Sequence, residues 1–217
     1  MESANPSYAL PLIPLANLRL AEGDVEAAVR LVERAVRIDP LHWSVLAYGG
    51  RTLAQARRPA RAAELGRKVM FRFPEHPSPP SWLGLWLAEA GQTTEAVAQT
   101  REALERVARD TVRWGRAPQE VTQNAAYVFA LVGYRAESER LLADVTEDPV
   151  YYRAAVEAAL GDFDAAFPAR EQAIEAGEYI GTPENLLGDL WLDPLHGDPR
   201  WERLLSRVQV LPPDEGD

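Results

Sequence analysis

The strongest constraint on the fold is a repeat, because short stretches of the sequence recur every 34 residues. One copy reads AEGDVEAAVRLVERAVRIDP, residues 21–40, and two looser copies follow at the same period. Small or β-branched residues hold matching places in these copies: Ala28, Ala62 and Ala96, then Ala35, Val69 and Ala103. Self-similarity at a period of this size indicates an array of similar structural units rather than one globular core.

Each unit has the start and stop signals of a pair of helices. A helix is expected to end near Gly23, because glycine takes the positive φ that closes a helix, and Asp24 then caps the next one. Pro40 ends the unit, since proline cannot continue a helix. One face of the intervening helix is apolar: Ala28, Leu31, Val32, Ala35 and Val36. A single pair cannot bury both of its apolar faces, so successive pairs are predicted to stack.

The later copies are less regular. Gly133 opens a fourth copy, in which Ser138 takes the alanine position, and Gly161 opens a fifth, in which Ala166 restores it. The spacing from Ala96 to Ser138 is 42 residues, eight more than the period. Residues 96–114 contain no helix breaker. The sequence therefore predicts a lengthened helix that ends near Gly115, followed by a helix with Pro118 in its first turn.

These residues resemble the tetratricopeptide repeat (TPR) family, in its bacterial type. The ladder of small, small, apolar and proline positions is the most specific part of the resemblance. The large–small pair of the first helix is present at Leu15–Ala16 and Leu83–Gly84, but Gly49–Gly50 and Ala125–Ala126 lack the large residue. The resemblance covers residues 9–178. It implies an all-α fold, a right-handed α-solenoid of about five TPR-like helix pairs plus C-terminal capping helices.

The pattern changes after residue 178, so four segments are expected. They are an N-terminal extension (1–8), the helical array (9–178), capping helices (179–211) and a disordered tail (212–217). Pro183 is expected in the first turn of a short helix that ends near Trp191. Asp198 is expected to cap a second helix, with Pro199 at its first position and an apolar stripe of Trp201, Leu204, Leu205 and Val208. LDPLHGDPRWERLL resembles the tail that follows TPR arrays in bacterial signalling proteins.

Composition excludes several classes of function. The net charge is −10, so binding of nucleic acid through overall charge is not expected. The absence of cysteine excludes disulfides, thiolate metal sites and a cysteine nucleophile. No apolar run is long enough to span a membrane, and the N-terminus lacks the basic region of a signal peptide. A cytoplasmic location is therefore expected.

No motif for catalysis or cofactor binding is present. The sequence contains no GxGxxG, Walker or GxSxG motif, and its three histidines lack metal-site spacing. Histidines beside turn prolines are predicted to lie in turns or caps. Asp162 and Asp164 lack the further oxygen ligands and the distal glutamate of a calcium loop. Glu171 and Glu175 are i, i+4 partners on a helix, which is more typical of a solvated face than of acid–base catalysis. We therefore expect no enzyme activity, no cofactor and no metal.

Two aromatic pairs leave alternatives open. Trp82 and Trp86 are i, i+4 partners, and Tyr151 and Tyr152 are adjacent. Each pair is interpreted either as packing between repeats or as the aromatic wall of a ligand groove.

The resemblance also implies a groove, because the first helices of TPR arrays line the inner face of a curved ribbon. The peptide-binding residues carried over by position are Asn17, Ser44, Ala47, Arg51, Ser81, Leu85, Gln123 and Tyr127. The carboxylate clamp that some TPR proteins use is matched here at Asn17 alone, so recognition of a chaperone tail is not expected. The small, apolar groove suits an extended or helical peptide with apolar anchors.

The leading hypothesis is a non-catalytic scaffold that binds a peptide or protein partner in this groove. The alternative is a regulatory module of a bacterial signalling or transcription-control system, which binds a peptide or a small ligand. The apolar face from Leu10 to Leu20 leaves two further readings open. It could pair with a second copy of the chain, or it could mark the chain as part of a larger protein.

Overall fold

The computed structural model describes residues 9–110, 113–115, 117–144, 150–177 and 189–209. Within these ranges there is no β-strand, and ten helices follow one another as five pairs. The pairs are α1 (Leu12–Ala21) with α2 (Val25–Ile38), α3 (Trp43–Gln55) with α4 (Pro59–Arg72), α5 (Ser78–Glu89) with α6 (Thr93–Arg109), α7 (Ala117–Leu131) with α8 (Arg135–Asp144), and α9 (Val150–Leu160) with α10 (Phe163–Glu175). A 3₁₀ helix, η2 (Leu190–Leu195), and α12 (Arg200–Gln209) follow.

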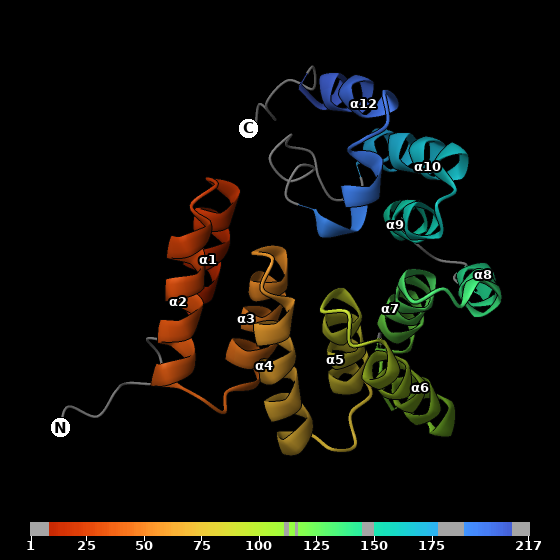
Figure 1. The fold of residues 1–217 in the computed structure, drawn as a ribbon. Coiled ribbons are helices and arrows are strands. Elements are labelled where there is room, and N and C mark those ends of the chain that lie inside the picture. Colours follow the sequence, from red (N-terminus) through yellow and green to blue (C-terminus); the bar gives the residue numbers. More distant parts are fainter. Residues whose placement is uncertain (1–8, 111–112, 116, 145–149, 178–188, 210–217) are drawn as a thin grey trace.

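The pairs are stacked along an arc (Figure 1). The first helices of successive pairs pack on one another in series, α1 on α3, α3 on α5, α5 on α7 and α7 on α9. The second helices α2, α4 and α6 each pack on the first helix of the next pair. The predicted all-α solenoid is confirmed.

The repeating small residues lie where helices meet. Side chains at these positions are completely buried: Ala28, Ala35, Ala62, Val69, Ala96, Ala103, Ser138, Ala166 and Ala173. A residue without a long side chain lets two helix backbones approach closely, which explains why alanine recurs at these positions. The repeat in the sequence is therefore a repeat of packing contacts.

The turns inside the first three pairs share one backbone conformation. Gly23 and Gly91 have φ values of 82° and 74°. Arg57 holds the equivalent place in the second pair and has φ 58°, although it is not glycine. A left-handed conformation costs a residue with a side chain roughly 1–2 kcal/mol. The second turn is therefore strained relative to its counterparts.

The predicted end of α6, the second helix of the third pair, is wrong. α6 is longer than α2 and α4, with 17 residues against 14 in each, but it ends at Arg109 rather than near Gly115. Asp110 leaves the helical conformation, and its carboxylate accepts a hydrogen bond from the backbone N–H of Arg113 at 3.0 Å. Aspartate readily forms such local hydrogen bonds in competition with the helix. Pro118 lies in the first turn of α7, as predicted.

The C-terminal helix covers the end of the array. Asp198 accepts a hydrogen bond from the backbone N–H of Arg200 at 2.9 Å, which confirms the predicted cap, and the helix itself begins at Arg200. Trp201 and Leu204 pack with Phe167 of α10 in a separate apolar cluster. Two carboxylates of α10 that were predicted to be solvated pair with Arg207 of α12: Glu171 at 3.0 Å and Glu175 at 2.9 Å.

Most of the short helix that was expected to end near Trp191 lies outside the described residues, so its end is not tested. Trp191 is the second residue of η2, which begins at Leu190 and continues to Leu195. Asp189 starts this helix, because its carboxylate accepts a hydrogen bond from the Trp191 backbone N–H at 3.1 Å. Pro183 and the terminal segments 1–8 and 212–217 lie outside the described residues.

Candidate functional site

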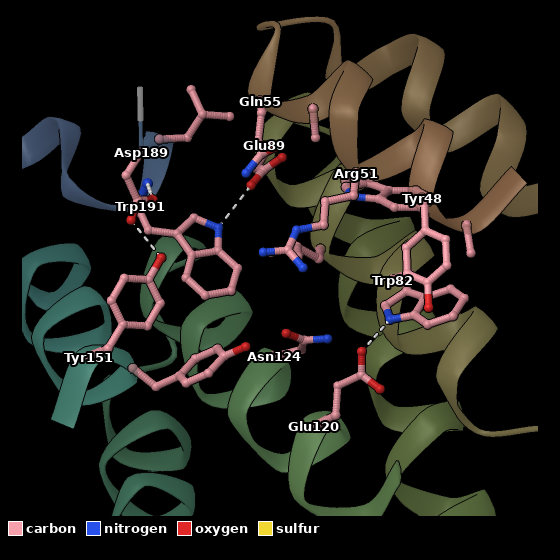
Figure 2. Close-up of a pocket in the computed structure, with 16 residues that line it drawn as sticks. Tyr48, Arg51, Gln55, Trp82, Glu89, Glu120, Asn124, Tyr151, Asp189 and Trp191 are labelled. Carbon is pink, nitrogen blue, oxygen red and sulfur yellow. Dashed lines mark hydrogen bonds between the residues drawn. The ribbon is translucent and has the colours of Figure 1, made fainter. Parts of the chain in front are cut away.

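A cavity of about 140 Å³ opens on the inner side of the arc (Figure 2). Its walls come from α3, α5, α7 and α9, the first helices of four pairs, and from residues 189–191. The polar and aromatic side chains that line it include Tyr48, Arg51, Gln55, Trp82, Glu89, Glu120, Asn124, Tyr151, Asp189 and Trp191.

The two tryptophans of α5 lie in different environments. Trp86 is buried against Gly50 and Gly66, where a Cβ on Gly50 would lie 2.4 Å from the indole. Trp82 is partly exposed in the cavity, and its Nε1–H donates to Glu120 at 2.7 Å. Trp86 therefore packs the repeats together, and Trp82 forms an aromatic wall.

Trp191 forms the opposite wall. Its ring centroid lies 4.8 Å from that of Tyr127 and 5.3 Å from that of Tyr152. Its Nε1–H donates to Glu89 Oε1 at 3.2 Å (Figure 2). Tyr151 also lines this side, and its hydroxyl donates to Asp189. The tyrosine pair of α9 therefore lines this side of the cavity.

An ion pair fixes the segment 189–195 across the inner side of the arc. Both terminal nitrogens of the Arg57 guanidinium, in the strained α3–α4 turn, donate to the carboxylate of Asp193, with Nη2 at 2.8 Å from Oδ1. The two residues are 136 positions apart in the sequence. Together with the hydrogen bond from Trp191 to Glu89, this pair holds the segment against α3 and α5. The segment therefore closes one side of the cavity as well as continuing the C-terminal cap.

Burial raises the pKa values of two carboxyl groups beside Trp191, those of Glu89 and Asp189. Burial raises the pKa of the Glu89 carboxyl to about 7; the hydrogen bond from Trp191 opposes this rise, and the carboxylates of Asp189 and Asp193 add to it. Glu89 Oε2 is buried and has no hydrogen-bond partner among the described residues. Burial also raises the pKa of Asp189, although hydrogen bonds from Tyr151 and the Trp191 backbone counter it. At pH 7 the Glu89 carboxyl therefore titrates.

Arg51 is the cationic group of the cavity lining. Figure 2 shows its side chain extending from α3 into the cavity, toward Trp191 and Asn124. It lies close enough to lower the pKa of Asp189, yet in the described part of the chain it donates no hydrogen bond. Its guanidinium therefore keeps its full set of N–H donors for another molecule.

The structure distributes the eight predicted groove residues among different environments. Ala47, Arg51 and Leu85 line the cavity, and Tyr127 lies behind it against Trp191. Ser81 and Gln123 are buried, Ser44 is partly buried at the start of α3, and exposed Asn17 accepts a hydrogen bond from Thr52 at 2.6 Å. The sequence-based set did not include Glu89, Asp189 or Trp191. No repeating pattern in the sequence indicates that Glu89 is buried at the end of α5, or that Asp189 and Trp191 return to the array.

The histidines of the first two inter-pair turns are capping residues, as predicted. His42 Nδ1 accepts a hydrogen bond from the backbone N–H of Ser44 at 3.2 Å, and His76 does the same for Ser78 at 3.2 Å. Asp162 caps α10 through the backbone N–H of Ala165. The described residues contain no cluster of three or more side chains suited to a metal ion. None of the described helices is both long and apolar enough to cross a membrane.

Comparison with known proteins identifies the fold. No family model and no curated protein matches the chain. Among solved structures, a tetratricopeptide repeat protein from Parabacteroides merdae superimposes with a TM-score of 0.57 at 16% identity, over 99% of this chain and 82% of that one. The kinesin light chain TPR-like repeats of Podosopora anserina give a TM-score of 0.53 at 23% identity, over 96% and 97%. The chain therefore has a TPR-like fold.

Proposed function

We propose that this TPR-like chain is a non-catalytic interaction module that binds a segment of a partner protein on the inner side of the arc. The observation that carries the proposal is the aromatic hollow formed where four first helices meet. TPR-like folds generally serve as protein-interaction scaffolds. A hollow with apolar walls and a few polar groups is the surface that anchors a protruding side chain.

The rim of the hollow has the chemistry of a protein interface. Tyr48 is 56% exposed, and Arg51 is exposed beside it on the same face of α3. Tyrosine, tryptophan and arginine are enriched at the residues that dominate binding energy, because they bury a large area at modest entropic cost. The net charge of −10 favours a protein partner over a nucleic acid.

A reaction centre is not part of the proposal. The described side chains that line the cavity include no serine, threonine, histidine or lysine, so a hydroxyl–imidazole pair or a lysine nucleophile is not present there. Two of the acidic groups, Glu120 and Asp189, already accept hydrogen bonds from Trp82 and Tyr151.

Capture of partners from the host cytoplasm with matched charge variants tests the proposal. Arg51→Glu changes the charge by two at the rim of the hollow, and Lys68→Glu makes the same change at an exposed site on α4. We expect a set of captured proteins that Arg51→Glu loses and Lys68→Glu retains. Equal capture by both variants, with unchanged melting temperatures, would refute binding on the inner side.

A second candidate function is a regulatory module that responds to a small ligand. The size of the cavity favours it, because a cavity of about 150 Å³ can hold a benzene molecule. A ligand that binds the folded state raises the melting temperature, which a scaffold without a ligand site would not show.

Self-association through the N-terminal pair is a separate proposal. Leu10, Leu15 and Leu18 are 39%, 38% and 54% exposed on or beside α1. Light scattering of a Leu15→Glu, Leu18→Glu variant tests it, since a mass equal to that of the unmodified chain would contradict pairing by this face.

A further inference from the structure

Two carboxylates of the cavity are already satisfied by the protein. Glu120 Oε1 accepts from the Trp82 indole at 2.7 Å. Asp189 accepts from the Tyr151 hydroxyl through one oxygen and from the Trp191 backbone N–H through the other. A carboxylate that already accepts at its oxygens has less capacity left for a guest. These groups shape the cavity and do not define what enters it.

Two other groups, of opposite character, retain capacity. The Arg51 guanidinium carries five N–H donors and uses none of them on the described residues. Glu89 Oε2 is a buried acceptor without a partner. A buried polar atom left unpaired is destabilising, and a guest that pairs with it recovers part of this cost. The complementary guest therefore has one anionic end and one end with N–H donors.

The walls and the size limit the rest of the guest. Trp82, Trp191 and Tyr151 present aromatic surface to the cavity, which suits a short apolar body. The volume of about 140 Å³ is close to that of a cavity that holds one benzene ring. A guest of a few carbons with two opposite charges fits these limits. An internal residue of a peptide does not carry both charges.

We propose that the cavity binds a free amino acid, with its carboxylate on Arg51 and its ammonium on Glu89. Paired, oppositely charged hydrogen bonds in a partly dehydrated site are stronger than neutral ones. Trp191 and Tyr151 enclose the carbon chain. The free amino acid and the partner segment proposed above would occupy the same cavity, and the titration below tests the amino acid in the absence of any partner.

Binding of the ammonium is coupled to a proton. Burial keeps the pKa of Glu89 at about 7, so a fraction of these carboxyls is protonated near neutral pH. An ammonium group favours the carboxylate and releases that proton. The groups that face Glu89 are Trp191, Asp189 and Asp193 from the C-terminal segment and Tyr127 from α7, with Arg51 from α3 across the cavity. Binding should therefore release a fraction of a proton per ligand near neutral pH, and none in Glu89→Gln.

Calorimetric titration of the full chain with a series of amino acids tests the proposal. The probes are leucine, α-alanine, β-alanine and γ-aminobutyrate, because their chain lengths vary the distance between the two charges. Propionate and propylamine are the probes with one charge each. Glu89→Gln and Arg51→Gln remove the two ends of the site. Glu105→Gln and Arg37→Gln make the same changes on exposed faces of α6 and α2.

We expect at least one zwitterion to bind and both single-charge probes to bind at least tenfold more weakly. Glu89→Gln and Arg51→Gln should each weaken that binding about tenfold or more, because a hydrogen bond between charged groups is worth about 1.5–3 kcal/mol. Absence of binding by every zwitterion would overturn the proposal. It would also be overturned by equal binding of propionate, or by unchanged proton release in Glu89→Gln. The Arg51 side chain is exposed, so its variant keeps the test valid if Glu89→Gln fails to fold.

Discussion

Replacement of Glu89 by glutamine should remove a large pH dependence of stability. Burial raises the pKa of this carboxyl from 4.5 to about 7 in the folded chain. The rise corresponds to roughly 3 kcal/mol, because one pKa unit is about 1.4 kcal/mol. Glutamine keeps an oxygen that can accept from Trp191 Nε1–H, but it cannot ionise. The variant therefore isolates the cost of placing a charge at this position.

The sign follows from proton linkage. Between pH 4.5 and 7 the folded chain holds the Glu89 proton and the unfolded chain releases it. Stability contributed by the neutral form is therefore complete below pH 4.5 and is lost as the pH rises to 7. From pH 4.5 to pH 8 the free energy of unfolding should fall by about 3 kcal/mol more in the unmodified chain than in Glu89→Gln.

Urea unfolding followed by far-ultraviolet circular dichroism at pH 4.5, 6, 7 and 8 measures this difference. Burial also raises the pKa of Glu157 and Asp189, so these groups add to the pH dependence of stability in every variant. The test is therefore the difference in pH dependence between Glu89→Gln and the unmodified chain. Glu105→Gln, at an exposed site, should follow the unmodified chain. Parallel pH profiles for Glu89→Gln and the unmodified chain would refute the assignment of a buried, titrating carboxyl.

Three further substitutions probe the packing of the fold. Gly50→Ala should lower the free energy of unfolding by about 1–2 kcal/mol by calorimetry, because its Cβ would lie 2.4 Å from the Trp86 indole and overpacking outweighs the gain in helix propensity; an increase would contradict this packing. Asp193→Ala should cost at most about 1 kcal/mol, and nothing in an Arg57→Gly background, since the pair is partly exposed; additive effects in a double-mutant cycle would contradict the ion pair. Trp201→Ala should cost about 3–5 kcal/mol in urea unfolding, because the side chain is 97% removed from solvent in the terminal cluster; a cost below 1 kcal/mol would contradict the cap.

The array itself follows from the sequence because its physical cause is periodic. Ala28 and Ala62 occupy equivalent interfaces, so the same need for a small residue between two helices recurs along the sequence. Local signals place the caps, as at Asp24, whose carboxylate accepts from the backbone N–H of Ala27 at 2.9 Å. The end of α6 is harder to place, since only the local competition of Asp110 for hydrogen bonds decides it.

The candidate site is only partly predictable, because it depends on one contact between distant segments. Arg51 follows from the repeat register, and Trp82 was recognised as either packing or wall. Trp191 and Asp193 lie beyond the periodic region, and no pattern in the sequence indicates that they return to α3 and α5. One available signal was Arg57, a non-glycine residue at a turn position where the neighbouring repeats have glycine.

The Arg57–Asp193 pair changes how mechanical load and unfolding should spread through the molecule. In an open solenoid each unit touches its neighbours alone, so the ends fray first and disorder moves inward one unit at a time. Here η2, which follows the fifth pair, is bound to the second pair through Asp193 and Arg57. The array therefore has a contact between units that are not neighbours in the sequence. Loosening the C-terminal end requires breaking a contact near the other end. Fraying of the C-terminal segment should therefore be coupled to the second pair, which an open solenoid would not show.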